Sequence, residues 1–423
     1  MERFLQIFKI KELRNKILIV LGLLVAYRVL AAIPIPGVNA QALQNYFNSN
    51  QLLGFLNFFS GGGLATLSVV MLGVGPYITA TIVMQLMTII FPRMKELYYE
   101  EGARGQAKFN QYARLLTVPF AFVQSYGFLK LLISQGVVPQ PDPFSLIRNV
   151  IVITAGSMIA MWLGELISEQ KVGNGISLII LAGILSRFPS SIGTALAAYT
   201  PTMLASYIGF IIIGFLLIAG IVYLNEGERK IPVAYARQVR GNKMYGGAQS
   251  YLPLKVNQAG MIPLIFAISV LLFPQFLAQI VVLFVPAWGL AINNFAQGFI
   301  ANQLYYGLFY FFLVFAFTYF YTAITFNPEE VAKNLQRSGG FVPGIRPGES
   351  TEKYFKNVTN RITFWGAVFL GLVAIFPIII QLLTGITIVT ISGTAILIVV
   401  AVALETMRMV DSELTVREYE GIE

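Results

Sequence analysis

Runs of about 20 mainly apolar residues recur along the whole of this chain of 423 residues. Each run is long enough to cross a lipid bilayer as a helix. Nine of them qualify directly: 17–33, 113–133, 146–168, 175–195, 202–224, 259–285, 304–326, 362–383 and 388–407. A further stretch, 52–91, is too long for one span and is interrupted by Gly61-Gly62-Gly63. It predicts a short re-entrant piece at about 52–68 and a span at 71–91. The sequence therefore predicts an all-α polytopic membrane protein with ten transmembrane helices.

Composition removes most enzyme chemistries. Charged residues make up 12% of the chain and hydrophobic residues 56%, whereas a soluble domain carries about 25% charged residues. The chain has no cysteine and no histidine. It therefore offers no disulfide, no thiolate nucleophile, and no imidazole base or metal ligand.

The positive charges predict how the helices are oriented. All but four of the 29 Lys and Arg residues lie in the amino-terminal segment, the turn at Lys171, the tail after 407, or the loops 92–114, 225–257 and 327–361. The alternate loops, near 34–51, 134–145, 286–303 and 384–387, contain none. Because cytoplasmic loops are rich in Lys and Arg, both termini are predicted to be cytoplasmic. Ten spans also permit two inverted halves of five helices, although no repeat is visible in the residues.

Two features inside the apolar stretches point to function. Arg28 lies within the first span, and an intramembrane charge is a candidate functional group; the alternative is that it pairs inside the bundle or snorkels to the interface. Segment 52–68 fits a re-entrant plug, because non-helical backbone at membrane depth must be covered by protein or face water. Its alternative is an amphipathic surface segment. Pro76 predicts a bend where the next span begins.

The loops 225–257 and 327–361 are long, basic and rich in Gly and Pro. Such charges can serve only to orient a membrane protein. However, loop 327–361 is longer than a connection requires, and Gly339–Gly348 (GGFVPGIRPG) reads as a finger presenting Arg346. We expect a docking surface for an anionic partner, such as ribosomal RNA or an acidic protein face.

A series of short motifs resembles the SecY family, the central subunit of the bacterial protein-conducting channel, with a plastid form as the alternative. The motifs are IPIPG (33–37), FSGG (59–62), PYITA (76–80), MWLGE (161–165), GNGIS (173–177), LPLKVN (252–257), FYTA (320–323) and FVPGIRPG (341–348). Each motif is weak alone, and their joint order over the chain is specific. The sequence departs from the family pattern at Gly75 and in the acidic balance of the tail.

The resemblance implies two inverted halves, at about 1–200 and 201–423, around an hourglass pore. It implies a ring of aliphatic side chains that resists wetting yet fits around a passing polypeptide: Val74, Ile78, Ile176, Ile180, Ile265 and Ile398. It also implies a plug at about 55–68 that swings on its glycine run and includes Phe58, Phe59, Ser60, Gly61, Gly62, Gly63 and Leu64.

The same resemblance implies a lateral gate between spans two and seven, beside spans three and eight. The uncharged polar groups available there are Thr79, Thr81, Gln85 and Ser269. Contacts between gate helices of about 0.6 kcal/mol each would compete with a signal peptide entering the gate.

The implied partners are SecE-like and SecG-like small subunits, the motor ATPase SecA, the ribosome, nascent chains and membrane lipid. Docking is assigned to Arg229, Lys230, Arg237, Arg240, Lys243 and Arg346. No cofactor is implied, and the location is the bacterial cytoplasmic membrane.

Two rival functions remain at this point. An inverted-repeat secondary transporter would have a solute site near the midplane, but the spans lack clustered charges. An intramembrane enzyme would need an aspartyl or serine mechanism, and Asp142 and Asp411, the two Asp residues, both lie outside the predicted spans.

Overall fold

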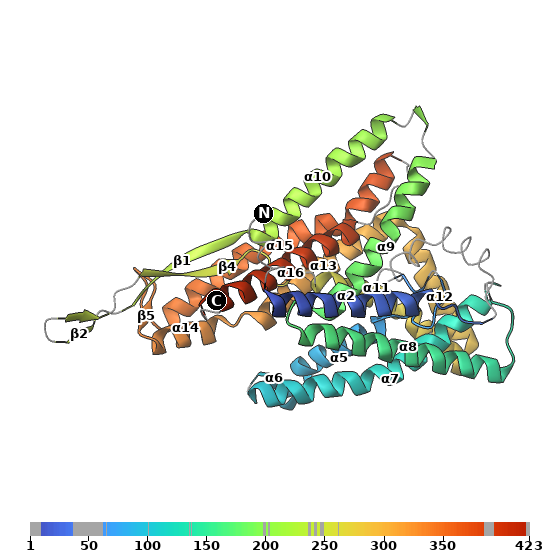
Figure 1. Ribbon diagram of the computed structural model, residues 1–423, viewed down its shortest axis with the longest axis horizontal. Coiled ribbons are helices and arrows are strands. Elements are labelled where there is room, and N and C mark those ends of the chain that lie inside the picture. The colour runs from blue at the N-terminus through green and yellow to red at the C-terminus, as the bar shows by residue number, and fades with distance from the viewer. Residues whose placement is uncertain are drawn as a thin grey trace. The chain divides into compact units, whose positions relative to one another are not determined.

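The computed structural model describes residues 10–36, 62–64, 66–99, 101–134, 136, 138–197, 200–201, 204–235, 238–240, 243–245, 249–260, 262–384 and 393–419 (Figure 1). Its helices are α2 (Lys11–Ala32), α5 (Gly75–Ile90), α6 (Pro92–Tyr99), α7 (Gly102–Ser134), α8 (Pro143–Glu169), α9 (Gly175–Ala197), α10 (Leu204–Glu226), α11 (Ile262–Phe284), α12 (Pro286–Ala301), α13 (Gln303–Thr325), α14 (Pro328–Arg337), α15 (Glu349–Thr384) and α16 (Gly393–Tyr419). Its strands are β1 (Glu228–Tyr235), β2 (Gln238–Arg240), β3 (Lys243–Tyr245), β4 (Gln249–Lys255) and β5 (Gly340–Phe341).

The apolar stretches fold as helices, the structure in which a segment satisfies its own backbone polar groups within lipid. By length and composition, five of the described helices can cross a membrane, within α2, α8, α10, α13–α14 and α15. The count becomes six if α5 and α6, which are bent by 112° relative to each other, form one broken span. The described residues thus contain several helices long and apolar enough to span a membrane, while the number ten stays a prediction.

The chain divides into two compact units. Unit 1 comprises Met1–Tyr199, Leu272–Gly298 and Val402–Glu423, and unit 2 comprises Thr200–Leu271 and Phe299–Ala401. Helices α11 and α16 therefore each contribute residues to both units.

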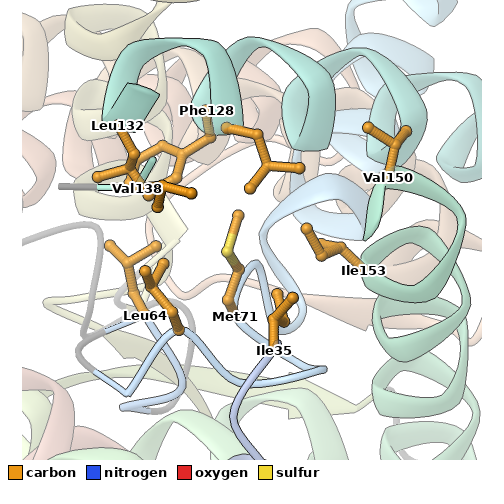
Figure 2. Close-up of a cluster of buried hydrophobic side chains, with 10 residues drawn as sticks. Ile35, Leu64, Met71, Phe128, Leu132, Val138, Val150 and Ile153 are labelled. Atoms are coloured by element: carbon orange, nitrogen blue, oxygen red, sulfur yellow. The ribbon is translucent and has the colours of Figure 1, made fainter. Parts of the chain in front are cut away.

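Unit 1 has a hydrophobic core that joins two long helices to two loop segments. Phe128 and Leu132 on α7 and Val150 and Ile153 on α8 meet side chains from the segments that follow α2 and precede α5. Figure 2 shows Met71 among them, with Ile35 and Leu64 on the loop side. The segment that leads into α5 is thereby packed against the membrane helices.

Unit 2 contains a small sheet that the all-α prediction missed. Strand β1 pairs antiparallel with β4 along seven residues and with β5 at its far end, and β2 pairs with β3. In β1 the buried side chains Ile231 and Val233 alternate with exposed neighbours. This period of two is that of a strand with one covered face, and β1 and β4 together form the antiparallel pair that we call the hairpin.

A second correction concerns the stretch 286–303, which was expected to be a loop and instead forms α12. The helix begins at Pro286, and proline is favoured at a first helical position because its missing N–H has no intrahelical partner there. The absence of Lys and Arg from this stretch gave information about charge and none about secondary structure.

Candidate functional site: an apolar constriction with its anchor and docking surface

Two of the six predicted ring residues lie at the start of α5. Val74 is the N-cap residue of the helix and Ile78 follows in its first turn. Gly73, with φ of +53°, turns the chain into the helix, and Pro76 occupies the first turn. Pro76 thus lies in the first turn of α5, where its missing N–H has no intrahelical partner. Val74 is completely buried.

The next two ring residues, Ile176 and Ile180, lie at the start of α9. This start packs tightly on α8, because a Cβ on Gly175 would lie 1.8 Å from the carbonyl oxygen of Gly164. The amide of Gly175 donates to Ser168 Oγ (2.9 Å), and the amide of Ser177 donates to Asn174 Oδ1 (3.3 Å). The motifs at 161–165 and 173–177 are thus the two sides of one close helix contact.

The side chain of Ile176 fills the space beside Gly164. A Cβ on Gly164 would lie 2.6 Å from Ile176 Cδ1, and Ile180 is fully buried. In unit 2, Ile265 on α11 and Ile398 on α16 are also buried. All six predicted ring residues are therefore aliphatic, and all lie on described helices or at their caps.

The predicted plug is only partly within the described residues. Phe58, Phe59, Ser60 and Gly61 lie outside them. Leu64 is buried in the core cluster of unit 1 (Figure 2). A Cβ on Gly63 would lie 2.7 Å from the carbonyl oxygen of Val70 and 2.8 Å from Ser68 Oγ. The end of the segment thus folds into a compact turn.

Backbone hydrogen bonds fasten this turn to the end of α2. The amide of Ile35 donates to the carbonyl of Leu67 (2.8 Å), and the amide of Val69 donates to the carbonyl of Ile33 (3.0 Å). Thr66 Oγ1 donates to the carbonyl of Ala31 (2.8 Å). We call residues 63–71 the anchor. That 55–68 swings stays a prediction; in this structure Gly63 and the described residues after it are held by these bonds and by packing.

The hydroxyls of the predicted gate each donate a bond within their own helix. Thr79 donates to the carbonyl of Gly75 (3.1 Å), Thr81 to that of Tyr77 (2.9 Å) and Ser269 to that of Ile265 (2.9 Å). Thr79 Oγ1 also accepts a long bond of 3.5 Å from Gln124 Nε2 on α7. In Gln85 the oxygen Oε1 is buried and has no hydrogen-bond partner. Of the four residues, Gln85 is the one with a buried side-chain oxygen that has no hydrogen-bond partner.

The side chains of three of the six residues predicted to dock a partner, Arg229, Lys230 and Arg346, are described in unit 2. Arg229 and Lys230 are exposed on β1, and Lys230 forms an ion pair of 3.3 Å with Glu228. Arg346 is exposed in the turn between β5 and α15, and its carbonyl accepts a bond of 2.9 Å from Thr351 Oγ1. Arg237 lies outside the described residues, as do the side chains of Arg240 and Lys243 on β2 and β3.

A shared core holds the two basic loops together. Ile231 and Leu254 from the hairpin pack with Ala332 on α14, with Val342, and with Phe355 on α15. Glycines at positive φ shape the finger around Arg346, with φ of +83° at Gly344 and +101° at Gly348. The loops 225–257 and 327–361 therefore form one basic module and not two independent surfaces.

Comparison with known proteins decides the family. The family model SecY matches residues 68–407. The protein translocase subunit SecY of Mycobacterium bovis is 39% identical, over 99% of this chain and 98% of its own length. The corresponding subunit of Synechocystis is 38% identical, over 100% of this chain and 96% of its own length. The chain belongs to the SecY family.

Solved structures agree with the fold. A SecY structure, described in terms of a plug domain that stabilises the closed channel, matches with a TM-score of 0.65 and 19% identity, over 95% of this chain and 92% of that one. Sec61 from a canine ribosome–channel complex matches with a TM-score of 0.62 and 19% identity, over 96% of this chain and 93% of that one. As a member of the SecY family, the chain is a protein translocase channel subunit and not an enzyme, and nothing in these comparisons supports a secondary transporter.

Two contacts of this SecY-family chain were not foreseen. Arg114 on α7 forms an ion pair of 2.5 Å with Glu165 on α8, and Lys16 on α2 forms one of 2.5 Å with Glu413 on α16. The sequence indicated only that a charged residue lies near the end of each of these apolar stretches. Hydropathy does not say which of several such charges meet.

The structure also shows what Arg28, the charge within the first predicted span, bonds to. Its Nη2 donates to the carbonyl oxygen of Ala182 and to Ser186 Oγ, both on α9. Of the two readings of this intramembrane charge, bonding inside the bundle is the one that the structure shows.

Proposed function

We propose that this chain conducts unfolded secretory polypeptides across the membrane through an apolar constriction and releases hydrophobic segments sideways into lipid. The observation that carries the proposal is the placement of Val74, Ile78, Ile176 and Ile180, four aliphatic side chains at the starts of α5 and α9, in a chain of the SecY family. Alkyl side chains resist wetting, so ions face a barrier, while their flexibility accommodates a passing chain. Ile265 and Ile398 complete the proposed ring.

The decisive experiment uses the absence of cysteine from the sequence. Ile180→Cys is the only thiol in the chain, and a stalled secretory precursor with a single cysteine is presented to it. We expect a disulfide whose yield depends on the position of the precursor cysteine along its length. A matched control, Val29→Cys on the exposed surface of α2, should give none. Equal yields at both positions, or no disulfide at Ile180→Cys while the precursor stays bound, would contradict the proposed pore.

The topology belongs to the same proposal. Ten spans in two inverted halves, about 1–200 and 201–423, would place both termini and the basic module in the cytoplasm of a bacterium. The distribution of Lys and Arg supports this orientation. Residues 55–68 would be the plug, and its described residues from Gly63 on belong to the anchor. Thr79, Thr81, Gln85 and Ser269 would line the lateral gate, through which signal peptides reach lipid.

The partners are proposed from the basic module. Its exposed Arg229, Lys230 and Arg346 suit an anionic surface, and the Sec61 relative was solved in a complex with a ribosome. We propose that the module docks the ribosome or the SecA motor, and that SecE-like and SecG-like subunits complete the channel. Arg237, Arg240 and Lys243 would extend the same surface.

A further inference from the structure

The end of α2 contacts two elements of unit 1 that each carry proposed ring residues. On one side, Arg28 Nη2 bonds to Ala182 and Ser186 of α9, the helix of Ile176 and Ile180. On the other side, Ala31, Ile33 and Ile35 bond to the anchor, which leads into α5 and Val74. All these residues belong to unit 1.

The bonds to α9 reach a face of the helix that is turned away from Ile180. Ala182 and Ser186 are four residues apart and so share one face. At 3.6 residues per turn, Ala182 is rotated about 160° away from Ile180. Ser186 Oγ in turn donates to the carbonyl of Gly183 (2.9 Å). The guanidinium thus bonds α9 through one nitrogen, Nη2, at both a main-chain and a side-chain acceptor.

The connection from the anchor to Val74 is short and carries three backbone hydrogen bonds. The amide of Met71 donates to the carbonyl of Ser68 (2.9 Å), that of Gly73 to Val70 (2.8 Å) and that of Gly75 to Leu72 (3.1 Å). Successive turns of this kind leave little freedom between the anchor and the start of α5. The position of Val74 therefore follows the position of the α2 end.

We propose that residues 28–35 act as a bracket that fixes the separation of Val74 from Ile180, and that Arg28 is a positioning residue of the constriction. The bracket would make the amino-terminal side of the constriction a rigid wall, with Arg28 holding α9 and the anchor holding the start of α5. This inference rests on the proposed function, because it assigns a role to the residues that set the ring.

The test follows the accessibility of a single thiol at the ring. The full chain with its companion subunits is reconstituted in vesicles, and Ile180→Cys is labelled with a membrane-impermeant methanethiosulfonate reagent. Arg28→Met removes the donors while keeping a long side chain. Because hydrogen bonds to charged groups are the stronger class, we expect labelling to become about tenfold faster. Arg28→Lys and Ser186→Ala should give smaller increases, since each keeps part of the contact.

Two controls separate positioning from general loosening. Val29→Met makes a similar change on an exposed neighbour and should leave the labelling rate unchanged. Ile153→Cys reports on the buried core of unit 1 and should stay unreactive in the Arg28→Met protein. An unchanged rate at Ile180→Cys overturns the bracket. A similar acceleration at Ile153→Cys also overturns it, because Arg28 would then only stabilise the unit.

Failure of the bracket is distinguishable from failure of the pore. If the precursor cross-links to Ile180→Cys but Arg28→Met does not alter the labelling rate, the proposed pore is supported and the proposed bracket is wrong. If the precursor never cross-links to Ile180→Cys, the proposed pore is wrong. In that case the labelling rates still report whether Arg28 holds α9 in place.

Discussion

The backbone amide of Ile35 donates a hydrogen bond of 2.8 Å to the carbonyl oxygen of Leu67. This bond joins the segment after α2 to the turn before α5, at a residue whose φ of +41° is unusual for leucine. Such a conformation persists only where the surroundings hold it. Leu67 is fully buried in the core cluster of unit 1, which supplies that support.

Gly156 on α8 is the first test of the anchor. A Cβ at this position would lie 2.1 Å from the carbonyl oxygen of Val69, so Gly156→Ala should push α8 and the anchor apart. Overpacking of this kind costs about 1–3 kcal/mol. We expect a lower thermal unfolding midpoint in detergent and a leakier resting channel. Gly22→Ala on α2, where nothing lies within 4 Å, should be neutral or slightly stabilising. Equal unfolding midpoints for the two variants would show that the close contact between Gly156 and Val69 does not affect stability.

The ring predicts a change in ion conductance. Replacing Ile180 and Ile265 with serine should let water enter the constriction, because a hydroxyl removes part of its resistance to wetting. The resting conductance of reconstituted channels should rise severalfold over that of the parent protein. Ile153→Ser, a change of the same kind in the buried core of unit 1, controls for loss of stability. If the resting current of the ring variant matched that of the parent, the apolar seal would lie elsewhere.

Arg346 predicts a salt-dependent defect. Arg346→Glu reverses the charge at the tip of the finger and should slow motor-driven translocation on the order of tenfold at low ionic strength, since like charges would then meet across the docking surface. Added salt shortens the Debye length. The translocation defect should therefore be smaller at higher ionic strength. Lys108→Glu, a reversal at an exposed position of α7, is the control for net charge. Normal translocation by Arg346→Glu would remove the finger from the docking surface.

Phe355 tests whether the two basic loops form one module. It is fully buried between the hairpin and α14, and Phe355→Ala should destabilise this core by about 3–5 kcal/mol. Hydrogen exchange at the amides of β1 and β4 should then accelerate, although these strands are about 100 residues away in sequence. The exposed neighbour change Lys356→Ala should leave exchange unaltered. Acceleration confined to α15 would mean that the loops fold independently.

Much of the fold was predictable because hydropathy is a local property. Each predicted span is overlapped by a described helix, since about 20 apolar residues in lipid have few alternatives to the α-helix. The strands β1 and β4 were missed because Gly and Pro in loop 225–257 were read as loop signals. The sequence places Ile231 and Val233 two residues apart, and the structure buries both. This spacing identifies a strand only once the neighbouring strands β4 and β5 are known.

The site was predictable to a smaller degree. The motifs identified the family and therefore the aliphatic ring positions. They did not reveal that Gly164 and Gly175 face each other, or that the gate hydroxyls bond to their own helices. Contacts of this kind depend on which helices become neighbours, and that choice is not encoded in any one window of residues.

The sequence by itself determined that this is a helical membrane protein without cysteine or histidine chemistry, and its motifs determined the family. The tertiary structure alone decided that Arg28 bonds to α9, that Gly63 and Val70 close a turn, and that two basic loops share the core around Phe355. The physical reason is distance along the chain. Burial of an apolar helix in lipid is a sum over adjacent residues, whereas Arg28 meets Ala182 across 154 positions, and only the folded backbone brings the two together.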